Sequence, residues 1–298
     1  MSGTPSPSLA LVVITHNSSR WLPAFFATWR DTLAASSRAR HLHCRTIIAD
    51  SGSSDDTHDA AARAAPAARL LPLGNLGYGP AANHAIAAAP DATHILLCNP
   101  DLTFPHNFAA AFLDPLAAQE PPFDRAACII PRLMNPDGST QPSVGRFFTI
   151  RDLIADQFRT REHRKYLHPQ PTVAQPIDWA MAACLLLRKD AFDAVGGFDD
   201  HFFLYVEEVD LLRRLRNAGR ESWFFPAAAV THHSPNAARS PRPEVQRYAA
   251  RGTLRYFAKH GSFLQLLSYR LLALLSRRLP PHEALAPRTS LLNHPTGP

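Results

Sequence analysis

Short apolar runs alternate with amphipathic stretches through the first 120 residues of the chain. The apolar runs are rich in aliphatic and β-branched residues and span residues 9–14, 43–49, 69–73 and 93–98. Runs of this kind are typical of inner parallel strands with both faces covered. Helical spacing follows them at residues 21–29, 56–65, from about 79, and at 106–118. This order predicts an α/β fold with a doubly wound, mainly parallel central sheet and flanking helices.

Carboxylates follow two of the predicted strands at the point where each strand ends. Asp50 ends the second apolar run, and Asp101 follows the fourth run after an Asn-Pro pair. Pro100 has no backbone N–H and a fixed φ, so the chain leaves the sheet there and holds Asp101 in a turn. Ligands of open α/β sheets bind at this edge, where a carboxylate can hold a divalent cation against a diphosphate. The alternative is that Asp101 caps the next helix, because Asn-Pro-Asp is an ordinary turn sequence.

A glycine-rich loop, GNLGYG, spans residues 74–79 and opens a helix that carries Asn83. Its spacing is neither GxGxxG nor GxxxxGK[ST], so the sequence supports neither a Rossmann dinucleotide site nor a P-loop. Such a loop still lets the backbone approach a nucleotide or phosphate closely.

Four motifs in this half occur in an order and spacing that resemble a known enzyme family. They are VVITHN at 12–17, IADSGSSD at 48–55, NLGYG at 75–79 with Asn83 downstream, and NPD at 99–101. In these motifs the chain is similar to the nucleotide-sugar half of family 2 glycosyltransferases, above all to bacterial rhamnosyltransferases of surface-polysaccharide assembly. The resemblance implies a GT-A fold and a nucleotide-diphosphate sugar donor, dTDP- or UDP-linked. It implies donor contacts by Thr15, Asn17, Asp50, Asn75, Gly77, Tyr78, Gly79, Asn83, Asn99 and Asp101.

Two residues depart from the usual pattern of that family. His16 stands where Tyr is common, and Asn99 stands where many relatives have Asp. With one carboxylate instead of two in this motif, we expect weaker binding of a metal ion.

The second half of the chain carries further motifs of the same family. They are DW at 178–179 followed by ACLL at 183–186, GGFD at 196–199, FFLYVEEVD at 202–210 and VTH at 230–232, so that the resemblance spans about residues 10–233. It implies that Glu208 is the general base, at a position where Asp is more usual, with Asp210 in a supporting role. It also implies a Mg²⁺ or Mn²⁺ site formed by Asp101 and His232, and acceptor contacts by Asp178, Trp179 and Glu207. A place in the core is the alternative for Trp179.

The remaining elements of this half follow from the apolar pattern. We expect strands at 126–131 and 177–187, a helix at 188–198 that glycine ends, and a helix from about residue 207. A second NPD, at 135–137, is followed by Gly138 and predicts a turn. Residues 149–166 have amphipathic spacing and predict either a segment that covers the sugar site or a solvated linker.

Positive charge is concentrated at the C-terminal end of a chain whose net charge is +6. Residues 239–298 contain ten Arg/Lys and two Asp/Glu, a net charge of +8, whereas the rest of the chain carries −2. We therefore divide the chain into a transferase domain at 1–238, with a donor half at 9–120 and an acceptor half at 121–238, and a basic helical extension at 239–298. A basic extension suits an anionic membrane surface or a nucleic acid.

The extension contains two predicted helices. Residues 244–260 place Arg247, Arg251 and Arg255 on one side of the first. Residues 262–278 are apolar, but too few and too interrupted by Arg270 to span a bilayer. This second helix fits a membrane surface with its arginines at the headgroups, and equally a contact with the sheet or with a second copy. We expect disorder in the last fifteen or so residues.

Cysteine usage and the N-terminus bear on localisation. Cys44, Cys98, Cys128 and Cys184 form no CxxC pair and predict reduced, structural thiols. The first eight residues lack the basic and apolar regions of a signal peptide. We expect a cytoplasmic protein, whose extension would meet the inner face of the cell membrane, and the oligomeric state stays open.

Together these features predict an inverting, metal-dependent glycosyltransferase. It would move a sugar, rhamnose from dTDP-rhamnose, to a hydroxyl of a lipid-linked saccharide or polysaccharide acceptor. One carboxylate base opposite the leaving group predicts a single displacement, by analogy with glycoside hydrolysis. One alternative is a sugar nucleotidyltransferase, although residues 15–20 lack the basic glycine-rich loop that such an enzyme needs. Another is a basic nucleic-acid- or membrane-binding protein without catalysis, although no nucleic-acid-binding motif is present, and we expect no nucleic-acid partner.

Overall fold

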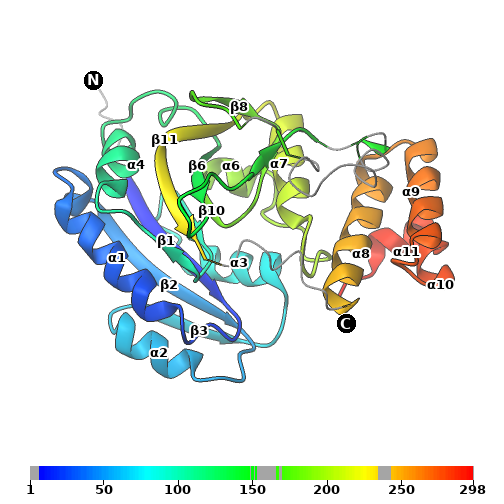
Figure 1. The fold of residues 1–298 in the computed structure, drawn as a ribbon, viewed down its shortest axis with the longest axis horizontal. Helices are drawn as coiled ribbons and strands as arrows, with labels where there is room; N and C mark the ends of the chain where they lie inside the picture. Colours follow the sequence, from blue (N-terminus) through cyan, green and yellow to red (C-terminus); the bar gives the residue numbers. More distant parts are fainter. Residues whose placement is uncertain are drawn as a thin grey trace.

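A mixed nine-stranded sheet runs through the centre of the computed structural model, which describes residues 7–147, 149–150, 152, 166–167, 170–233 and 243–297. Its order is β3-β2-β1-β4-β10-β6-β11-β5, with β8 paired to β11 (Figure 1). The strands are β1 (Ser8–Thr15), β2 (His43–Ser51), β3 (Arg69–Leu73), β4 (His94–Cys98), β5 (Leu102–Thr103), β6 (Cys128–Met134), β8 (Gln175–Ile177), β10 (Cys184–Arg188) and β11 (Ser222–His232). A separate pair consists of β7 (Val144–Gly145) and β9 (Trp179–Ala180).

One strand direction dominates the sheet. β1 is parallel to β2 and β4, and β2 is parallel to β3. β10 is antiparallel to both β4 and β6, and β11 is parallel to β6. It follows that β6 and β11 point the same way as β1 to β4. The predicted α/β fold with a mainly parallel sheet is confirmed, and β10 is the reversed strand at its centre.

Helices cover both faces of this sheet because every inner strand is apolar on both sides. α1 (Leu22–Ala35), α2 (Thr57–Ala64) and α4 (Phe108–Ala117) pack on one face, and α3 (Tyr78–Ala87), α6 (Lys189–Ala194) and α7 (Glu207–Asn217) on the other. A short 3-10 turn, η1 (Ala39–His41), follows α1. Successive residues of β1 alternate between the two cores, with Val12 in one and Val13 in the other. The predicted order of strands and helices through residue 118 is therefore confirmed.

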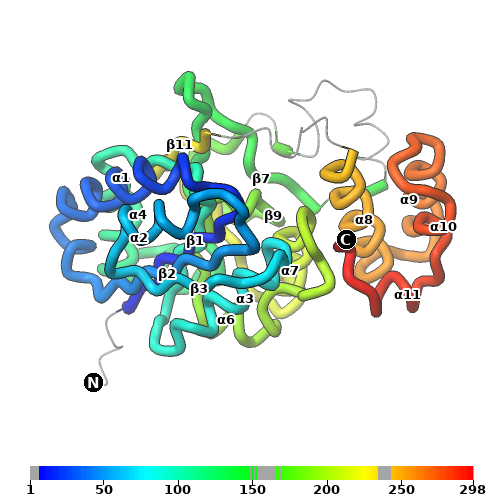
Figure 2. Tube along the Cα trace, turned by 90° about the horizontal axis from the view of Figure 1, so that it is seen from below, coloured from blue at the N-terminus to red at the C-terminus, as the bar shows by residue number. Residues whose placement is uncertain are grey.

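The C-terminal extension forms a helical layer at one end of the molecule, beyond α7 (Figures 1 and 2). It consists of α8 (Pro243–His260), α9 (Phe263–Leu275), α10 (Pro281–Ala284) and α11 (Arg288–Asn293). Ser262 and Gln265 form a capping box that fixes the start of α9. The chain end returns to α8 in both views.

One expectation for the extension is wrong. The end of the described chain packs on the protein: Thr296 is buried, and its backbone N–H donates to the His201 carbonyl over 2.8 Å. The predicted basic side of α8 is only partly exposed: Arg247 is exposed, whereas Arg255 is buried against Asp199 and Arg251 pairs with Glu283. Composition does not show such partners, since they lie far away in the sequence.

Two further predictions concern the middle of the chain. The turn at residues 135–138 is confirmed, because the Gly138 N–H donates to the Asn135 carbonyl over 2.9 Å and Met134 bridges Thr140 in antiparallel fashion. The amphipathic segment predicted at 149–166 lies largely outside the described residues.

The glycine-rich loop packs directly on the segment that precedes α7. Gly77 has φ +88°, and a Cβ there would lie 2.0 Å from the carbonyl oxygen of Phe203. The Tyr78 N–H donates to that same oxygen over 2.9 Å. Only glycine combines this left-handed backbone with so close an approach.

Gly77→Ala should lower the free energy of unfolding by about 1–3 kcal/mol, because the new Cβ meets the Phe203 backbone in a strained conformation. Gly74→Ala is the control, since no atom lies within 4 Å of its Cβ position. That variant should stay within about 0.5 kcal/mol of the parent protein in urea unfolding. Equal stability of the two variants would contradict the close packing.

Candidate functional site

Asn99, Asp101 and His232 meet at the carboxyl edge of the sheet. β4 ends just before Asn99, and β11 ends at His232. The Asp101 Oδ1 lies 3.4 Å from the His232 Nε2, and the Asn99 Nδ2 lies 3.5 Å from the same nitrogen. The backbone fixes the arrangement, because the His233 N–H donates to the Asp101 carbonyl over 2.9 Å. Both Asp101 and His232 are buried. Two strands distant in the chain thus supply one compact N/O group.

The His232 ring is oriented by Gln141. The His232 Nδ1 lies 3.1 Å from the Gln141 Oε1, which can only accept a hydrogen bond, so Nδ1 is the donor in this contact and Nε2 is the ring nitrogen that faces Asp101. A second hydrogen bond of this kind is usual for histidines that bind metal ions. No group of three or more His, Cys, Asp or Glu side chains suited to a metal lies within the described residues. The donor set fits a divalent ion that takes its other ligands from a diphosphate or water.

Glu207 and Glu208 open α7, and Tyr78 stands beside them. Desolvation raises the pKa of Tyr78 well above its usual value, and the negative charge of Glu207 is the next largest cause, with a smaller effect of Glu208. The Tyr78 hydroxyl donates to the Ala182 carbonyl over 2.8 Å. The neighbouring Ala183 carbonyl accepts the Asn99 N–H over 2.9 Å. Tyr78 therefore connects the start of α7 to the turn that carries Asp101.

Gly79 packs between Phe198 and Glu207. A Cβ at Gly79 would lie 3.5 Å from the Cβ of Glu207 and 3.1 Å from that of Phe198. Glu207 is buried in this contact. The glycine-rich loop and α7 thus belong to one packed unit.

Asp50 lies buried at the end of β2 with a full set of donors. Its carboxylate accepts from the Thr15 hydroxyl over 2.8 Å, from the Ser53 N–H over 2.9 Å and from the Ser53 hydroxyl over 2.5 Å, and the His58 Nε2 lies 2.9 Å away. Burial alone would raise the pKa of Asp50, but these hydrogen bonds outweigh it, and the pKa is lowered. The predicted donor residues Thr15 and Asp50 are therefore brought together, and the carboxylate is ionised at neutral pH.

Two other predicted donor residues lie on exposed loops at this edge. The Asn17 Oδ1 accepts from the Ser54 N–H over 2.8 Å and so joins the ends of β1 and β2. Asn75 is exposed, and its backbone packs on Gly52, whose Cβ position is 2.9 Å from the Asn75 nitrogen. Their contacts with a donor stay predictions.

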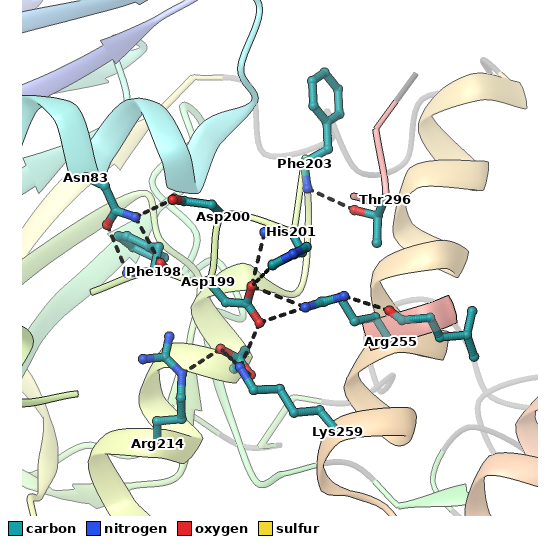
Figure 3. A network of polar contacts seen from close by, with 12 residues as sticks. Asn83, Phe198, Asp199, Asp200, His201, Phe203, Arg214, Arg255, Lys259 and Thr296 are labelled. Atoms are coloured by element: carbon teal, nitrogen blue, oxygen red, sulfur yellow. Dashed lines mark hydrogen bonds and ion pairs between the residues drawn. The ribbon is translucent and has the colours of Figure 1, made fainter. Parts of the chain in front are cut away.

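Asn83 links the two halves of the sheet domain (Figure 3). Its Oδ1 accepts from the Phe198 N–H over 2.9 Å, while its Nδ2 donates to the Phe198 carbonyl and to the Asp200 Oδ1. These contacts give the amide a structural use, and its predicted contact with the donor stays a prediction.

Two predicted acceptor residues lie apart from this group. Trp179 is fully buried, and its Nε1–H donates to the Arg146 carbonyl over 2.7 Å, which favours the core alternative over stacking on a sugar. Asp178 pairs with Arg216 over 2.8 Å at the far end of α7, about 12 Å along the helix from Glu208. Asp178 lines a cavity of about 520 Å³ together with Arg216 and Gln170.

Sequence analysis missed Gln141, which orients His232 although it lies in no recognised motif. Two histidines also contact residues at this edge: the exposed His58 lies 2.9 Å from the Asp50 Oδ2, and His233 stacks on Trp21 with ring centroids 5.6 Å apart. For Gln141 the only local signal is its place after the confirmed turn at 135–138.

Residues 10–196 match the glycosyl transferase family 2 profile, so the chain belongs to this family and is a glycosyltransferase. It is 34% identical over 247 residues to the N-acetylglucosaminyl-diphospho-decaprenol L-rhamnosyltransferase of Mycobacterium tuberculosis, covering 77% of each chain. It is also 25% identical to the rhamnosyltransferase WbbL of Escherichia coli over 62% of this chain and 72% of that one. The relatives are thus rhamnosyltransferases, and neither alternative class from the sequence is supported.

The fold has solved counterparts. The mannosyltransferase PcManGT of Pyrobaculum calidifontis, in complex with GDP-Man and Mn²⁺, aligns with a TM-score of 0.53 and 16% identity over 97% of this chain and 73% of that one. This likeness confirms the expected GT-A glycosyltransferase fold.

Asp50→Asn should lower the free energy of unfolding by about 2 kcal/mol at pH 7, because a charged acceptor of several hydrogen bonds is lost. The pKa of Asp50 is lowered in the folded state, so its stabilisation is present above the unfolded pKa of about 3.9 and is lost as the pH falls through the folded pKa. Urea unfolding of both proteins from pH 7 to pH 3 should show the difference shrinking. Asp56→Asn, on the exposed side of the same loop, is the control. A difference that does not change with pH would contradict this role.

Proposed function

We propose that the protein transfers rhamnose from a nucleotide-diphosphate sugar to a hydroxyl group of a lipid-linked saccharide. We propose dTDP-rhamnose as the donor in preference to UDP-linked sugars. The similarity to the mycobacterial N-acetylglucosaminyl-diphospho-decaprenol L-rhamnosyltransferase supports both the sugar and the lipid-linked acceptor. The meeting of Asp101 and His232 at the ends of β4 and β11 supports the proposed chemistry most directly.

Asp101 and His232 are the residues that would hold a divalent cation, Mg²⁺ or Mn²⁺, with Asn99 beside them. When bound, such a cation supplies positive charge for the diphosphate that leaves the sugar. Thr15 and Asp50 would contact the nucleotide, and the 74–79 loop would approach the donor with its backbone. The Mn²⁺ complex of the mannosyltransferase is consistent with this assignment on a shared fold.

Glu208 is the proposed general base. Its carboxylate takes the proton from the acceptor hydroxyl while the hydroxyl oxygen bonds to the anomeric carbon. The bond from that carbon to the diphosphate oxygen breaks in the same step, and the electron pair leaves with the nucleotide diphosphate. One displacement of this kind inverts the anomeric configuration. Glu207, buried beside Gly79, would hold the start of α7 and contact the acceptor.

Asp101→Ala should weaken donor binding in the presence of Mn²⁺ at least about tenfold, which corresponds to about 1.4 kcal/mol. Titration calorimetry with dTDP-rhamnose, with and without Mn²⁺, measures the effect. The chain contains its own control: Asp137 belongs to the other Asn-Pro-Asp, in an exposed turn, and Asp137→Ala should bind as the parent does. If both variants bind the donor equally well, Asp101 is not at the donor site.

Glu208→Gln should leave donor binding within about twofold and lower kcat by roughly 10²–10⁴, because the amide cannot accept the proton. Transfer to a short-chain, water-soluble analogue of the lipid-linked acceptor measures kcat without a membrane. Near-normal turnover would show that another residue is the base.

We also propose that α9 lies on the membrane that carries the acceptor. Eight large hydrophobic side chains are exposed in the described residues, and six of them belong to α9 and the loop after α10: Phe263, Leu264, Leu267, Leu271, Leu275 and Leu285. The five on α9 fall within about 120° of the helix circumference. No helix within the described ranges is both long and apolar enough to cross a bilayer.

Charge next to this stripe favours an anionic lipid surface over a second copy of the chain. Exposed Arg277 lies two residues beyond the end of α9, and Arg278 follows it. The extension as a whole carries a net charge of +8. Two copies that faced each other through α9 would bring these like charges together, whereas anionic headgroups would neutralise them.

Leu264→Ser combined with Leu275→Ser should reduce binding to vesicles that contain phosphatidylglycerol at least about tenfold, because each leucine contributes about 1 kcal/mol or more when it enters the lipid. Val173→Ser, at an equally exposed apolar residue outside the extension, is the control and should bind normally. Vesicle flotation measures the binding. Unchanged flotation, or a dimer that the double variant converts to a monomer, would reject the membrane surface.

A further inference from the structure

The residues just before α7 adopt a backbone that L-amino acids rarely take. Tyr205 has φ +69° and Val206 has φ +74°, and Glu207 and Glu208 come directly after this pair. A left-handed conformation costs on the order of 1–3 kcal/mol at a non-glycine residue and is least favourable for a β-branched one. Such a pair persists only where its surroundings hold it in place. The direction in which Glu208 leaves the backbone depends on this pair.

Helix α8 packs closely against the Tyr205–Val206 pair at Gly252. A Cβ at Gly252 would lie 2.6 Å from the carbonyl oxygen of Tyr205 and 3.4 Å from the Cβ of Val206. Upstream, the Phe203 N–H donates to the Thr296 hydroxyl over 2.8 Å, and the Phe203 ring packs on Tyr248 of α8 with centroids 4.9 Å apart. The extension therefore contacts the segment along its length.

Cations of α8 also hold the carboxylates on either side of the segment (Figure 3). Lys259 bridges them, with its Nζ 2.8 Å from the Asp199 Oδ2 and 2.9 Å from the Asp210 Oδ1. Arg255 adds a contact of 3.1 Å to Asp199, and the His260 Nε2 lies 2.7 Å from Asp210. Asp210 is fully buried, so these partners offset a large cost of desolvation. One helix thus fixes both ends of residues 199–210.

We propose that α8 is a positioning element for the general base. It holds the left-handed Tyr205–Val206 pair, through Gly252 and Lys259, so that the first turn of α7 presents Glu208 to the acceptor hydroxyl. This inference rests on the proposed role of Glu208. None of the α8 residues touches the substrate in this scheme, and their effect reaches the reaction through the backbone of residues 205–208.

Gly252→Ala tests the contact with the backbone. Alanine favours a helix over glycine by about 1 kcal/mol, so the substitution does not weaken α8 itself. Its Cβ must displace the Tyr205 carbonyl, and a displacement near 1 Å at a reacting group lowers kcat about 10²-fold. We expect this loss on the soluble acceptor analogue, with the Kd of dTDP-rhamnose unchanged.

Lys259→Met and Lys259→Arg test the ionic contact. The methionine variant should lose kcat at least about tenfold, since Asp199 and Asp210 are no longer bridged. The arginine variant should recover most of it, because the guanidinium keeps the positive charge and its fork of N–H donors can reach both carboxylates. Arg247→Met, at an exposed position of the same helix, is the matched control and should keep the parental kcat.

The outcomes separate this inference from the proposed function. If Gly252→Ala and Lys259→Met keep kcat within twofold while Glu208→Gln is inactive, Glu208 is the base but α8 does not position it. If kcat falls only in proportion to loss of donor binding and of the urea midpoint, α8 merely stabilises the fold. If Glu208→Gln is active, the base itself is wrongly assigned, whatever the α8 variants do.

Discussion

The shared direction of the strands is the constraint on which the site depends. The parallel register of β1 with β2 and β4 sets Thr15 opposite Asp50 and brings Cys98 level with Val13. Because β10 runs backwards between β4 and β6, the next strands recover the original direction, and β11 ends at the same edge as β4. Without that reversal His232 would end at the opposite edge of the sheet, far from Asp101. The strand directions alone therefore place these residues at one edge of the sheet.

Much of this arrangement can be predicted from the sequence because its signals are local. Continuous apolar runs define β1 to β4, and the polar residues that follow each run identify the edge at which Asp50 and Asp101 lie. Four motifs in a fixed order add the family, which the profile match confirms. The pairing of Asp101 with His232 could be predicted only through the resemblance to the family, since 131 positions separate the two residues.

The parts that sequence could not supply all depend on distant partners. Trp179 looks the same in sequence whether it lines a sugar site or lies in a core, and only its burial and its hydrogen bond to the Arg146 carbonyl favour the core. Arg251 and Arg255 look like a solvated basic stripe until Glu283 and Asp199 are found beside them. The positive charges of the extension therefore form two groups: some pair with carboxylates inside the protein, and others remain at the surface. Composition cannot reveal this division.

The two hydrogen bonds between Asn83 and the Phe198 backbone limit how parts of such enzymes can be exchanged. The Asn83 amide accepts from the Phe198 N–H and donates to the Phe198 carbonyl, and so links residues 9–120 to residues 121–238. An exchange of the second of these parts between related transferases must therefore preserve both hydrogen bonds, along with the close contact between Gly77 and Phe203. A chimera that preserves only the sheet register would leave amide groups without hydrogen-bond partners where the two parts meet. A few short hydrogen bonds, rather than the extent of the interface, therefore limit the exchange of parts in this fold.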